Sequence, residues 1–182
     1  PVMTREPVWQ PSASQAALKS RAQQLLFVRG FFAKRGVLEV ETPVLGRCGV
    51  TDVNLDGIPA QVSAGTREGG WLQTSPEYHM KRLLAAGCGS IFQISRVFRN
   101  GEQGRRHNPE FSMLEWYRTG FDDVTLMAEV SDLVCGWLGC ERPEKIQYRD
   151  ALRRWAHIDP FAATDRELMR RCEEWLEPEQ LA

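Results

Sequence analysis

The chain has 182 residues, of which 42% are hydrophobic and 26% are charged. This composition is typical of a soluble globular protein, and the length suits one domain or part of a larger one. The formal net charge is −1, so no overall field draws the chain toward nucleic acid or a membrane, and any anion site must be local.

The sequence gives no sign of a membrane or secreted protein. No apolar run approaches the ~18 residues of a membrane span, and no signal peptide opens the chain. The five cysteines are odd in number and include no Cys-x-x-Cys pair, which indicates reduced thiols without a zinc site or disulfide framework. Cys135 and Cys140 are conceivable metal ligands, but Cys135 lies in an apolar helical run that favours a core or near-core thiol. We therefore expect a cytoplasmic protein with no membrane partner, and we predict no metal ligand.

The first elements are an extended lead-in and a long helix. Residues 1–13 carry three prolines and little periodicity. A helix should start near Ser12 or Ser14, either of which can cap it, and run to about Lys34. Its apolar positions recur mostly at three- and four-residue spacings: Leu18, Ala22, Leu25, Leu26, Val28, Phe31 and Phe32. Gly36 ends the helix, and a strand over 37–43 should follow.

A glycine-rich region leads to a second helix. Residues 46–70 predict a ragged hairpin with a mobile loop around 63–70. A strand at 71–73 should precede a helix that Thr74 or Ser75 caps, that Pro76 begins and that ends near residue 86. Glu77, at the start of this helix, needs no role beyond satisfying the helix dipole.

The most informative stretch, residues 91–117, predicts two strands joined by a polar loop. Apolar Phe92, Ile94 and Phe98 alternate with mainly polar residues, as in a half-buried strand. One face of the second strand carries a mixed set: Phe111, Met113, Glu115 and Tyr117. The loop adds donors suited to phosphate: Arg105, Arg106, His107 and Asn108. Together they predict a platform for a ligand that is both anionic and cationic.

The C-terminal part should be mainly helical. Asp122 or Asp123 can cap a helix over 124–138, whose predicted buried face is Leu126, Met127, Val130, Leu133, Val134 and Trp137. A short strand at 145–148, a helix from about residue 150 and a charged last helix over 164–176 should follow.

Three segments resemble, in the correct order, the motifs of class II lysyl-tRNA synthetases. Residues 36–43 (GVLEVETP) resemble the first motif, and 73–82 (QTSPEYHMKR) resemble the segment that recognises the amino acid. Residues 98–117 resemble the second motif. The resemblance covers nearly everything from residue 9 to about 160. It implies an α+β fold over residues 14–182. This would be a class II aminoacyl-tRNA synthetase-like catalytic domain, in which helices flank an antiparallel sheet. It also implies a homodimer through the first-motif helix and strand.

The details are more similar to one branch, the elongation factor P lysine ligases. The branch-like segments are 9–12 (WQPS), 74–80 (TSPEYHM) and 114–118 (LEWYR). About a dozen residues precede the first helix, too few for the five-stranded anticodon-binding barrel of a lysyl-tRNA synthetase. The resemblance implies ATP-dependent activation of lysine, with (R)-β-lysine favoured, to an aminoacyl-adenylate. Transfer to a lysine of elongation factor P would follow, and tRNA is not an expected partner.

The resemblance also assigns roles to residues. Arg99 is the expected catalytic residue, bridging the α-phosphate of ATP and the substrate carboxylate, which suits a planar guanidinium. The expected ATP-binding residues are Arg99, Asn100, Glu102, His107, Asn108 and Phe111. The expected substrate-binding residues are Ser75, Glu77, Glu115 and Tyr117. Among these, Phe111 would stack on adenine, His107 would contact the distal phosphates, and Glu115 with Tyr117 would receive the substrate ε-ammonium.

Two departures from the family pattern bear on the site. An acid usually follows Phe-Arg-Asn directly, but here Gly101 precedes Glu102. The sequence also contains no Gly-x-Gly-x-Gly-x-x-Arg third motif and no paired acids for Mg²⁺, so the metal ligands are expected outside this chain. An unpaired sheet edge and an incomplete core are then expected. Two alternatives stay open: a lysyl-tRNA synthetase catalytic core, and a truncated, catalytically silent fragment that binds ATP, a partner subunit or elongation factor P.

Overall fold

The computed structural model describes residues 9, 11–61 and 69–180, and the chain divides into two compact units, Pro1–Cys140 and Glu141–Ala182. The first unit contains two small sheets and three helices among its described residues. The second unit is helical in its described part. No helix within the described ranges combines the length and apolarity needed to cross a membrane.

The first unit opens with the predicted long helix, α1 (Gln15–Ala33). Ser14 caps it, because its hydroxyl oxygen accepts a hydrogen bond from the Ala17 N–H at 3.1 Å. Near the end of α1, Phe31 and Phe32 are buried, whereas Leu18 and Leu26 are 57% and 74% exposed. Only the C-terminal part of the predicted apolar face therefore packs inside this unit.

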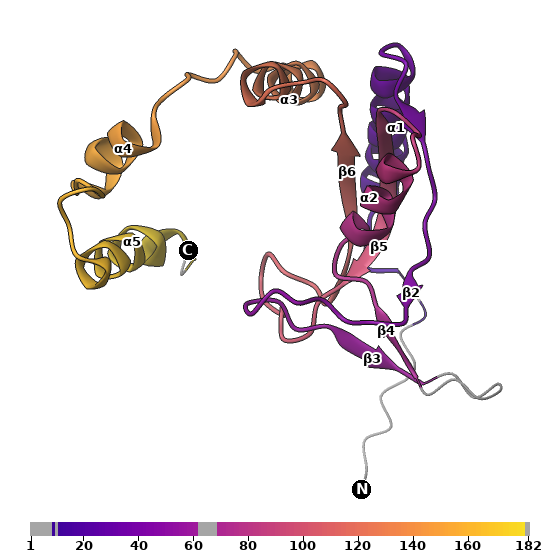
Figure 1. The fold of residues 1–182 in the computed structure, drawn as a ribbon, viewed down its shortest axis with the longest axis horizontal. Helices are drawn as coiled ribbons and strands as arrows, with labels where there is room; N and C mark the ends of the chain where they lie inside the picture. Colours follow the sequence, from indigo (N-terminus) through magenta and orange to yellow (C-terminus); the bar gives the residue numbers. More distant parts are fainter. Residues whose placement is uncertain (1–8, 10, 62–68, 181–182) are drawn as a thin grey trace, which may run out of the picture. The chain divides into compact units, whose positions relative to one another are not determined.

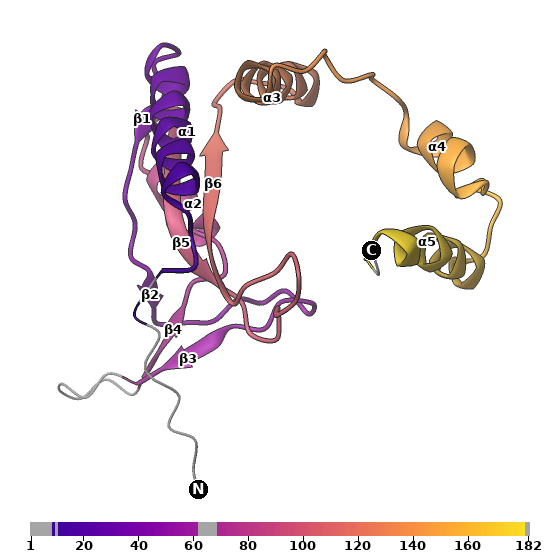
Figure 2. The same ribbon diagram turned by 180° about the vertical axis from the view of Figure 1, so that it is seen from behind.

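The main sheet has the strand order β1-β5-β6 and lies beside α1 (Figures 1 and 2). Its strands are β1 (Leu38–Glu39), β5 (Ile91–Phe98) and β6 (Glu110–Tyr117). β6 is antiparallel to β5, but β1 is parallel to it, so the sheet is mixed rather than antiparallel throughout. The predicted strand over 37–43 is wrong in length. Only Leu38 and Glu39 form regular ladder pairs with β5, and the Val40 N–H adds one further bond to the Phe92 carbonyl at 2.9 Å.

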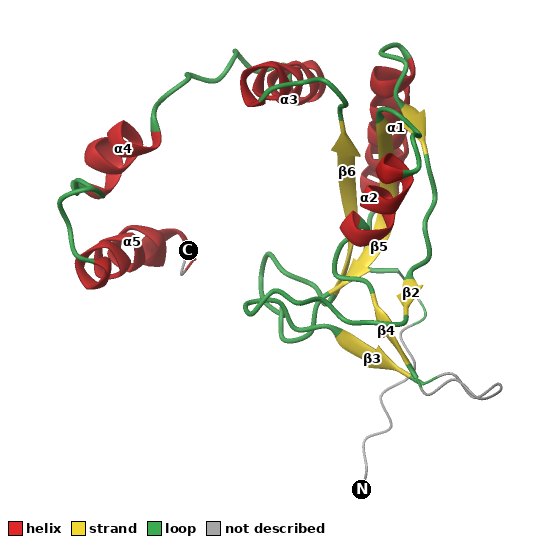
Figure 3. Cartoon of the chain, viewed as in Figure 1, coloured by secondary structure: helices red, strands yellow, loops and turns green. Residues whose placement is uncertain are grey.

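A second small sheet has the order β2-β4-β3 and is antiparallel (Figure 3). Its strands are β2 (Leu45–Gly46), β3 (Ile58–Ala60) and β4 (Gly70–Leu72). The strand predicted at 71–73 is β4, shifted by one residue, and it pairs with β3 in a hairpin that extends beyond the predicted 46–70. Residues 62–68 of the predicted mobile loop lie outside the described residues. Helix α2 (Glu77–Ala85) begins one residue later than predicted, with Pro76 just before its first turn.

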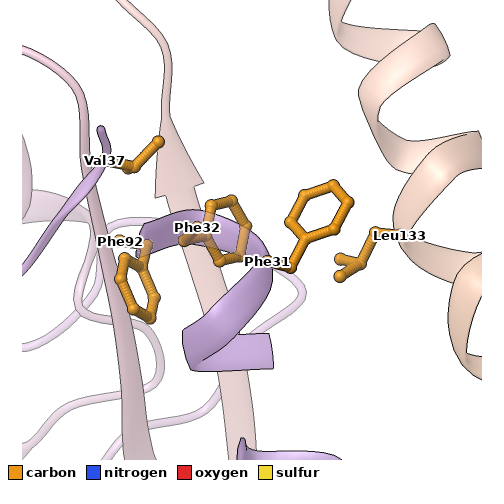
Figure 4. Packing of buried hydrophobic residues seen from close by; sticks show 5 residues of the cluster. All are labelled: Phe31, Phe32, Val37, Phe92 and Leu133. Carbon is orange, nitrogen blue, oxygen red and sulfur yellow. The ribbon is translucent and has the colours of Figure 1, made fainter. Parts of the chain in front are cut away.

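The core of the first unit is a cluster of Phe31, Phe32, Val37, Phe92 and Leu133 (Figure 4). The Phe32 ring stacks on Phe92 at 4.6 Å between centroids and meets Phe31 edge-on at 5.2 Å. Burial of one such side chain contributes roughly 1.5–3 kcal/mol. This cluster therefore fixes α1 against β5, the strand that carries one side of the candidate site.

Helix α3 (Asp123–Leu138) begins one residue before the predicted start and buries only part of the predicted face: Leu133 is buried and Leu126 and Trp137 are half-buried. Asp122 caps it by accepting from the Thr125 N–H at 2.8 Å. Met127, Val130 and Val134 are 48%, 38% and 42% exposed, while the carboxylate of Glu129 is buried. The face is rotated because Trp116, Arg118 and Arg35 offer Glu129 partners at the sheet side, a gain the apolar pattern alone does not reveal.

The second unit contains α4 (Tyr148–Ala151), a π-helical turn η1 (Leu152–Ala156) and α5 (Asp165–Gln180). The strand predicted at 145–148 is wrong, since Tyr148 already begins α4 and 145–147 have no regular structure. Thr164 caps α5 as predicted. Thr164 N–H donates to the Glu167 carboxylate at 3.0 Å, and Glu167 N–H donates to the Thr164 hydroxyl at 3.4 Å.

Candidate active site

The antiparallel register of β5 and β6 builds one polar face of the main sheet. Gln93 pairs with Glu115, Ile91 pairs with Tyr117, and Val97 pairs with Phe111. Because side chains alternate along a strand, Glu115 and Tyr117 point to the same side. Gln93 is buried on this face, and the Thr42 hydroxyl donates to its side-chain oxygen at 3.0 Å. The predicted carboxylate–phenol pair is thus set on a rigid strand.

Ser75 and Tyr117 both donate hydrogen bonds to the Glu115 carboxylate. The Ser75 hydroxyl reaches Oε2 at 2.6 Å, and the Tyr117 hydroxyl reaches Oε1 at 2.6 Å. Burial, then the hydrogen bond to Glu115 and its negative charge, raise the pKa of the Tyr117 phenol far above its usual range. A carboxylate offers about four lone-pair positions, so two remain for a further donor such as an ammonium group.

Ser75 sits between this strand and helix α2. Its hydroxyl oxygen also accepts from the Glu77 N–H at 3.1 Å, which satisfies a donor of the first helical turn. One side chain therefore bonds to the first residue of α2 and fixes the Glu115 carboxylate. Sequence reasoning expected Thr74 or Ser75 as the N-cap, but the N-cap position is Pro76 and Ser75 precedes it. It proposed Ser75 as a substrate-binding residue and did not predict that Ser75 contacts Glu115.

Arg99 follows the end of β5 and stacks near Phe111. Its guanidinium carbon lies 5.3 Å from the Phe111 ring centroid. Nε donates to the Thr74 carbonyl at 3.4 Å, and Nη1 lies 3.5 Å from the Glu102 carboxylate. These long contacts use two of the five N–H donors of a guanidinium. Arg99, Glu102 and Phe111, three of the predicted ATP-binding residues, are therefore neighbours.

The other predicted ATP-binding residues lie in an exposed loop. Asn100, His107 and Asn108 are exposed, as are Arg105 and Arg106. A tight turn shapes the loop, with Gly104 N–H donating to the His107 carbonyl at 3.0 Å. The structure therefore leaves these side chains in solvent instead of gathering them with Arg99.

Glu77 is engaged within its own helix. Lys81 Nζ lies 2.6 Å from Oε1 of Glu77, and the two side chains are 57% and 45% exposed. The hydrogen bond and charge of Glu77 raise the pKa of Lys81. An exposed pair of this kind contributes little to stability, so a ligand amine can compete for Glu77.

A cavity of about 330 Å³ adjoins the N-terminal end of α2. Ser75, Glu77 and Tyr78 line it together with Asp52 and Trp71. Thr51 and Tyr78 exchange a hydrogen bond of 2.7 Å at its edge. The sequence signals for this cavity are weak, because residues 46–56 have no regular pattern.

Gln73 also lines the cavity and was not predicted as a site residue. It is only 8% exposed, and its Nε2 donates to the Arg96 carbonyl at 2.9 Å. Its buried Oε1 has no hydrogen-bond partner among the described residues. The available signal was a polar residue directly after the apolar pair Trp71 and Leu72, where β4 ends.

The described part of the chain holds no group of three or more His, Cys, Asp or Glu side chains placed to bind a metal ion.

Comparison with known proteins assigns this arrangement to a family. The model of tRNA synthetases class II (D, K and N) matches residues 8–166. The match covers most of the chain, which therefore belongs to this class II tRNA synthetase family.

Individual relatives are named more narrowly. An elongation factor P–(R)-β-lysine ligase of Mannheimia succiniciproducens is 50% identical over 175 residues, which are 94% of this chain and 54% of that protein. A protein of the same name from Photorhabdus laumondii is 53% identical over 88% of this chain and 50% of its own length. Another from Salmonella paratyphi B is 50% identical over 91% of this chain and 52% of its own length. The chain thus spans about half the length of these relatives.

Proposed function

We propose that this chain is part of an ATP-dependent ligase that activates lysine, with (R)-β-lysine favoured, and transfers it to a lysine of elongation factor P. Two kinds of support meet in this proposal. Relatives at about 50% identity carry that name. The chain also presents a twice hydrogen-bonded carboxylate, Glu115, on the same strand face as Tyr117, with Arg99 beside Phe111 at the end of the neighbouring strand.

The Glu115 arrangement carries the proposal. Ser75 and Tyr117 hold both oxygens at 2.6 Å, so the carboxylate is oriented before a ligand arrives. Such a group favours a primary ammonium, because partial burial of a carboxylate is costly without a cationic partner. We assign the ε-ammonium of lysine to Glu115 and Tyr117. We assign the amine nearer the carboxylate to Glu77, where it would displace Lys81.

At the other end, Arg99 would hold two anions at once. A carboxylate oxygen of lysine attacks the α-phosphorus of ATP, the bond from that phosphorus to the bridging oxygen breaks, and pyrophosphate leaves. Such a step needs alignment and charge neutralisation more than proton transfer. Arg99 would supply both, Phe111 would stack on adenine, and Asn100, Glu102, His107 and Asn108 would contact ATP as the loop closes. Mg²⁺, held by residues outside this chain, would neutralise phosphate charge.

In the second step the acyl group leaves the adenylate. The uncharged ε-amino group of the acceptor lysine attacks the carbonyl carbon, the bond to AMP breaks, and the new amide nitrogen loses a proton. Ser75 is the residue we assign to distinguishing (R)-β-lysine from α-lysine, because it touches both Glu115 and the start of α2. We also propose a cytoplasmic location, which fits a reaction that consumes ATP.

Lysine-dependent ATP–pyrophosphate exchange tests the proposal. We expect exchange from a chain extended to the length of the relatives, little or none from the 182-residue chain, and loss of exchange in the extended Arg99→Ala enzyme. Arg96→Ala is the matched control, because Arg96 is on the same strand but 62% exposed and pairs only loosely with Glu110 at 3.6 Å. Retention of more than a few per cent of exchange by Arg99→Ala would contradict the role of Arg99.

A lysyl-tRNA synthetase core is the second candidate, favoured by the family match itself. Equal or faster exchange with (S)-α-lysine, together with charging of tRNA, would overturn the ligase proposal in its favour. Binding of ATP or elongation factor P with no exchange at either length would instead indicate a catalytically silent protein.

A further inference from the structure

Two thiols meet at the C-terminal end of α3. Cys135 lies in the last turns of the helix, and Cys140 follows the helix by two residues. The Cys140 thiol points to Cys135, with the two sulfur atoms 3.6 Å apart. We propose that Cys135 and Cys140 form a reversible intramolecular disulfide when the chain meets a low-molecular-weight disulfide such as oxidised glutathione. Neither the composition nor the proposed ligase activity calls for this site.

The backbone of Gly139 brings the two cysteines together. Its φ of +66° is left-handed, and its N–H donates to the Cys135 carbonyl at 2.8 Å. This turn directs the next residue back over the last helical turn. The spacing of five residues, which carries no disulfide signal in the sequence, thereby becomes a close pair in space.

Formation of the bond requires only a local movement. A disulfide has a sulfur–sulfur distance of about 2.05 Å, so the two atoms must approach by roughly 1.5 Å. Cys140 is exposed, and residues 141–147 after it have no regular secondary structure. Cys135 is half-buried and lies 3.9 Å from the Ser131 hydroxyl. We therefore assign the movement to Cys140, the more exposed of the two residues, which lies outside the helix.

The chemistry balances with two thiols and one oxidised glutathione. The Cys140 thiolate attacks a sulfur of the glutathione disulfide and expels one glutathione thiolate. The Cys135 thiolate then attacks the Cys140 sulfur and expels the second, and the two protein protons end on the two glutathione thiols. Only the thiolate attacks, and the hydrogen bond to Cys135 raises the pKa of the Cys140 thiol, so the first step should be slow at neutral pH and become faster as the pH rises.

Mass spectrometry of the 182-residue chain tests the proposal. Reduced protein is incubated in glutathione buffers of increasing oxidised fraction, alkylated and digested. Chymotryptic cleavage after Trp137 separates the two cysteines, so a disulfide keeps the two peptides joined until reduction. We expect joined peptides, loss of two hydrogens and protection of both cysteines from alkylation, all reversed by dithiothreitol.

Cys88 is also exposed, so its rate of alkylation is the internal reference for a free thiol, and Cys88→Ser is the control variant for Cys140→Ser. Cys140→Ser should abolish the joined peptides, and Cys88→Ser should leave them unchanged. Glutathione attached to Cys140 without a joined product, or alkylation of the pair at the rate of Cys88 at every redox ratio, would overturn the proposal. Circular dichroism of each variant verifies that the helices are retained.

Discussion

The Ser75 hydroxyl donates to the Glu115 carboxylate across 2.6 Å, joining the start of α2 to the middle of β6. The same oxygen accepts from the Glu77 N–H. A residue that resembles a simple helix cap thus also sets the orientation of the carboxylate proposed to bind lysine.

Ser75→Ala should therefore weaken lysine binding as well as stability. A hydrogen bond to a charged group contributes about 1.5 kcal/mol, which corresponds to a roughly tenfold higher KM for lysine in the length-extended enzyme. Ser14→Ala removes the corresponding cap of α1, far from the site in sequence, and should cost about 1 kcal/mol of stability with no change in KM. A KM for lysine that stays the same in Ser75→Ala as in Ser14→Ala would show that the Ser75 hydroxyl acts only on the start of α2.

Tyr117 should make the chain less stable at alkaline pH. Burial and the Glu115 carboxylate raise its pKa in the folded state above the value of about 10 found in unfolded chains. The folded state then holds the phenol proton more tightly than the unfolded chain does. The contribution of protonated Tyr117 to the free energy of unfolding is therefore complete below about pH 10 and is lost progressively above it. Urea unfolding at increasing pH should show this loss, and Tyr117→Phe should flatten the slope. Tyr148→Phe, which alters a 66% exposed phenol, should not change it.

Most of the site strands, but less of the packing, could be predicted from the sequence. The bounds of α1, β5, β6 and α3 follow from caps, glycines and period-two alternation, which are local signals. The buried face of α3 followed only in part: Leu133 is buried as predicted, but Glu129 is drawn inward by partners on other elements. The predictions of a strand over 37–43 and of a strand at 145–148 were wrong in length and in kind, because a short run becomes a strand only where another strand lies alongside it: 38–39 pair with β5, and 145–147 form no strand. Arg99 and Phe111 are adjacent as the motif implies, whereas the contact of Ser75 with Glu115 required the fold.

Glu129→Gln should be strongly destabilising. Glu129 is 5% exposed, accepts from Trp116 Nε1 at 3.2 Å and pairs with Arg35 at 3.7 Å. Arg118 Nε lies 3.3 Å from Oε1, close enough for charge attraction but not aligned for a hydrogen bond. Arg35 also lies 3.5 Å from Asp132, so neutralising Glu129 removes mainly the anion beside mostly buried Arg118, at a cost of about 3 kcal/mol.

Equilibrium urea unfolding measures this effect against an exposed ion pair. Glu39 pairs with Arg29 at 3.0 Å, but the two side chains are 38% and 50% exposed. Glu39→Gln should therefore cost at most about 1 kcal/mol. A similar shift for both variants would mean that the Glu129 cluster adds nothing beyond a surface pair.

Leu26→Asp tests the homodimer that the resemblance to the first motif implies, which we propose forms through α1 and β1. Leu26 on α1 is 74% exposed and Leu38 on β1 is 56% exposed, which leaves apolar surface on the first-motif elements. An aspartate at the centre of a dimer interface would be buried without a partner, so the variant should be monomeric in analytical ultracentrifugation. Val53→Asp is the control, since Val53 is 94% exposed and lies outside these elements. A dimer that survives Leu26→Asp would place the interface elsewhere.

Asp159 should control the order of the second unit in a pH-dependent way. Arg149 contacts it with two hydrogen bonds of 3.0 and 2.6 Å, Arg153 with one of 2.6 Å, and the Phe161 N–H with one of 3.1 Å. Arg149 is the main reason that the pKa of Asp159 is well below its usual range. The folded state favours the charged carboxylate, so the stabilisation by the Asp159 carboxylate is present above the unfolded pKa of about 3.9 and is lost as the pH falls below it.

Asp159→Asn should remove this stabilisation at neutral pH, and hydrogen exchange should then be faster across residues 148–163. Asp150→Asn is the matched control, because Asp150 is 59% exposed and lies 3.9 Å from Arg153. Unchanged exchange in Asp159→Asn would show that the helices, not this cluster, hold the turn between η1 and α5 together.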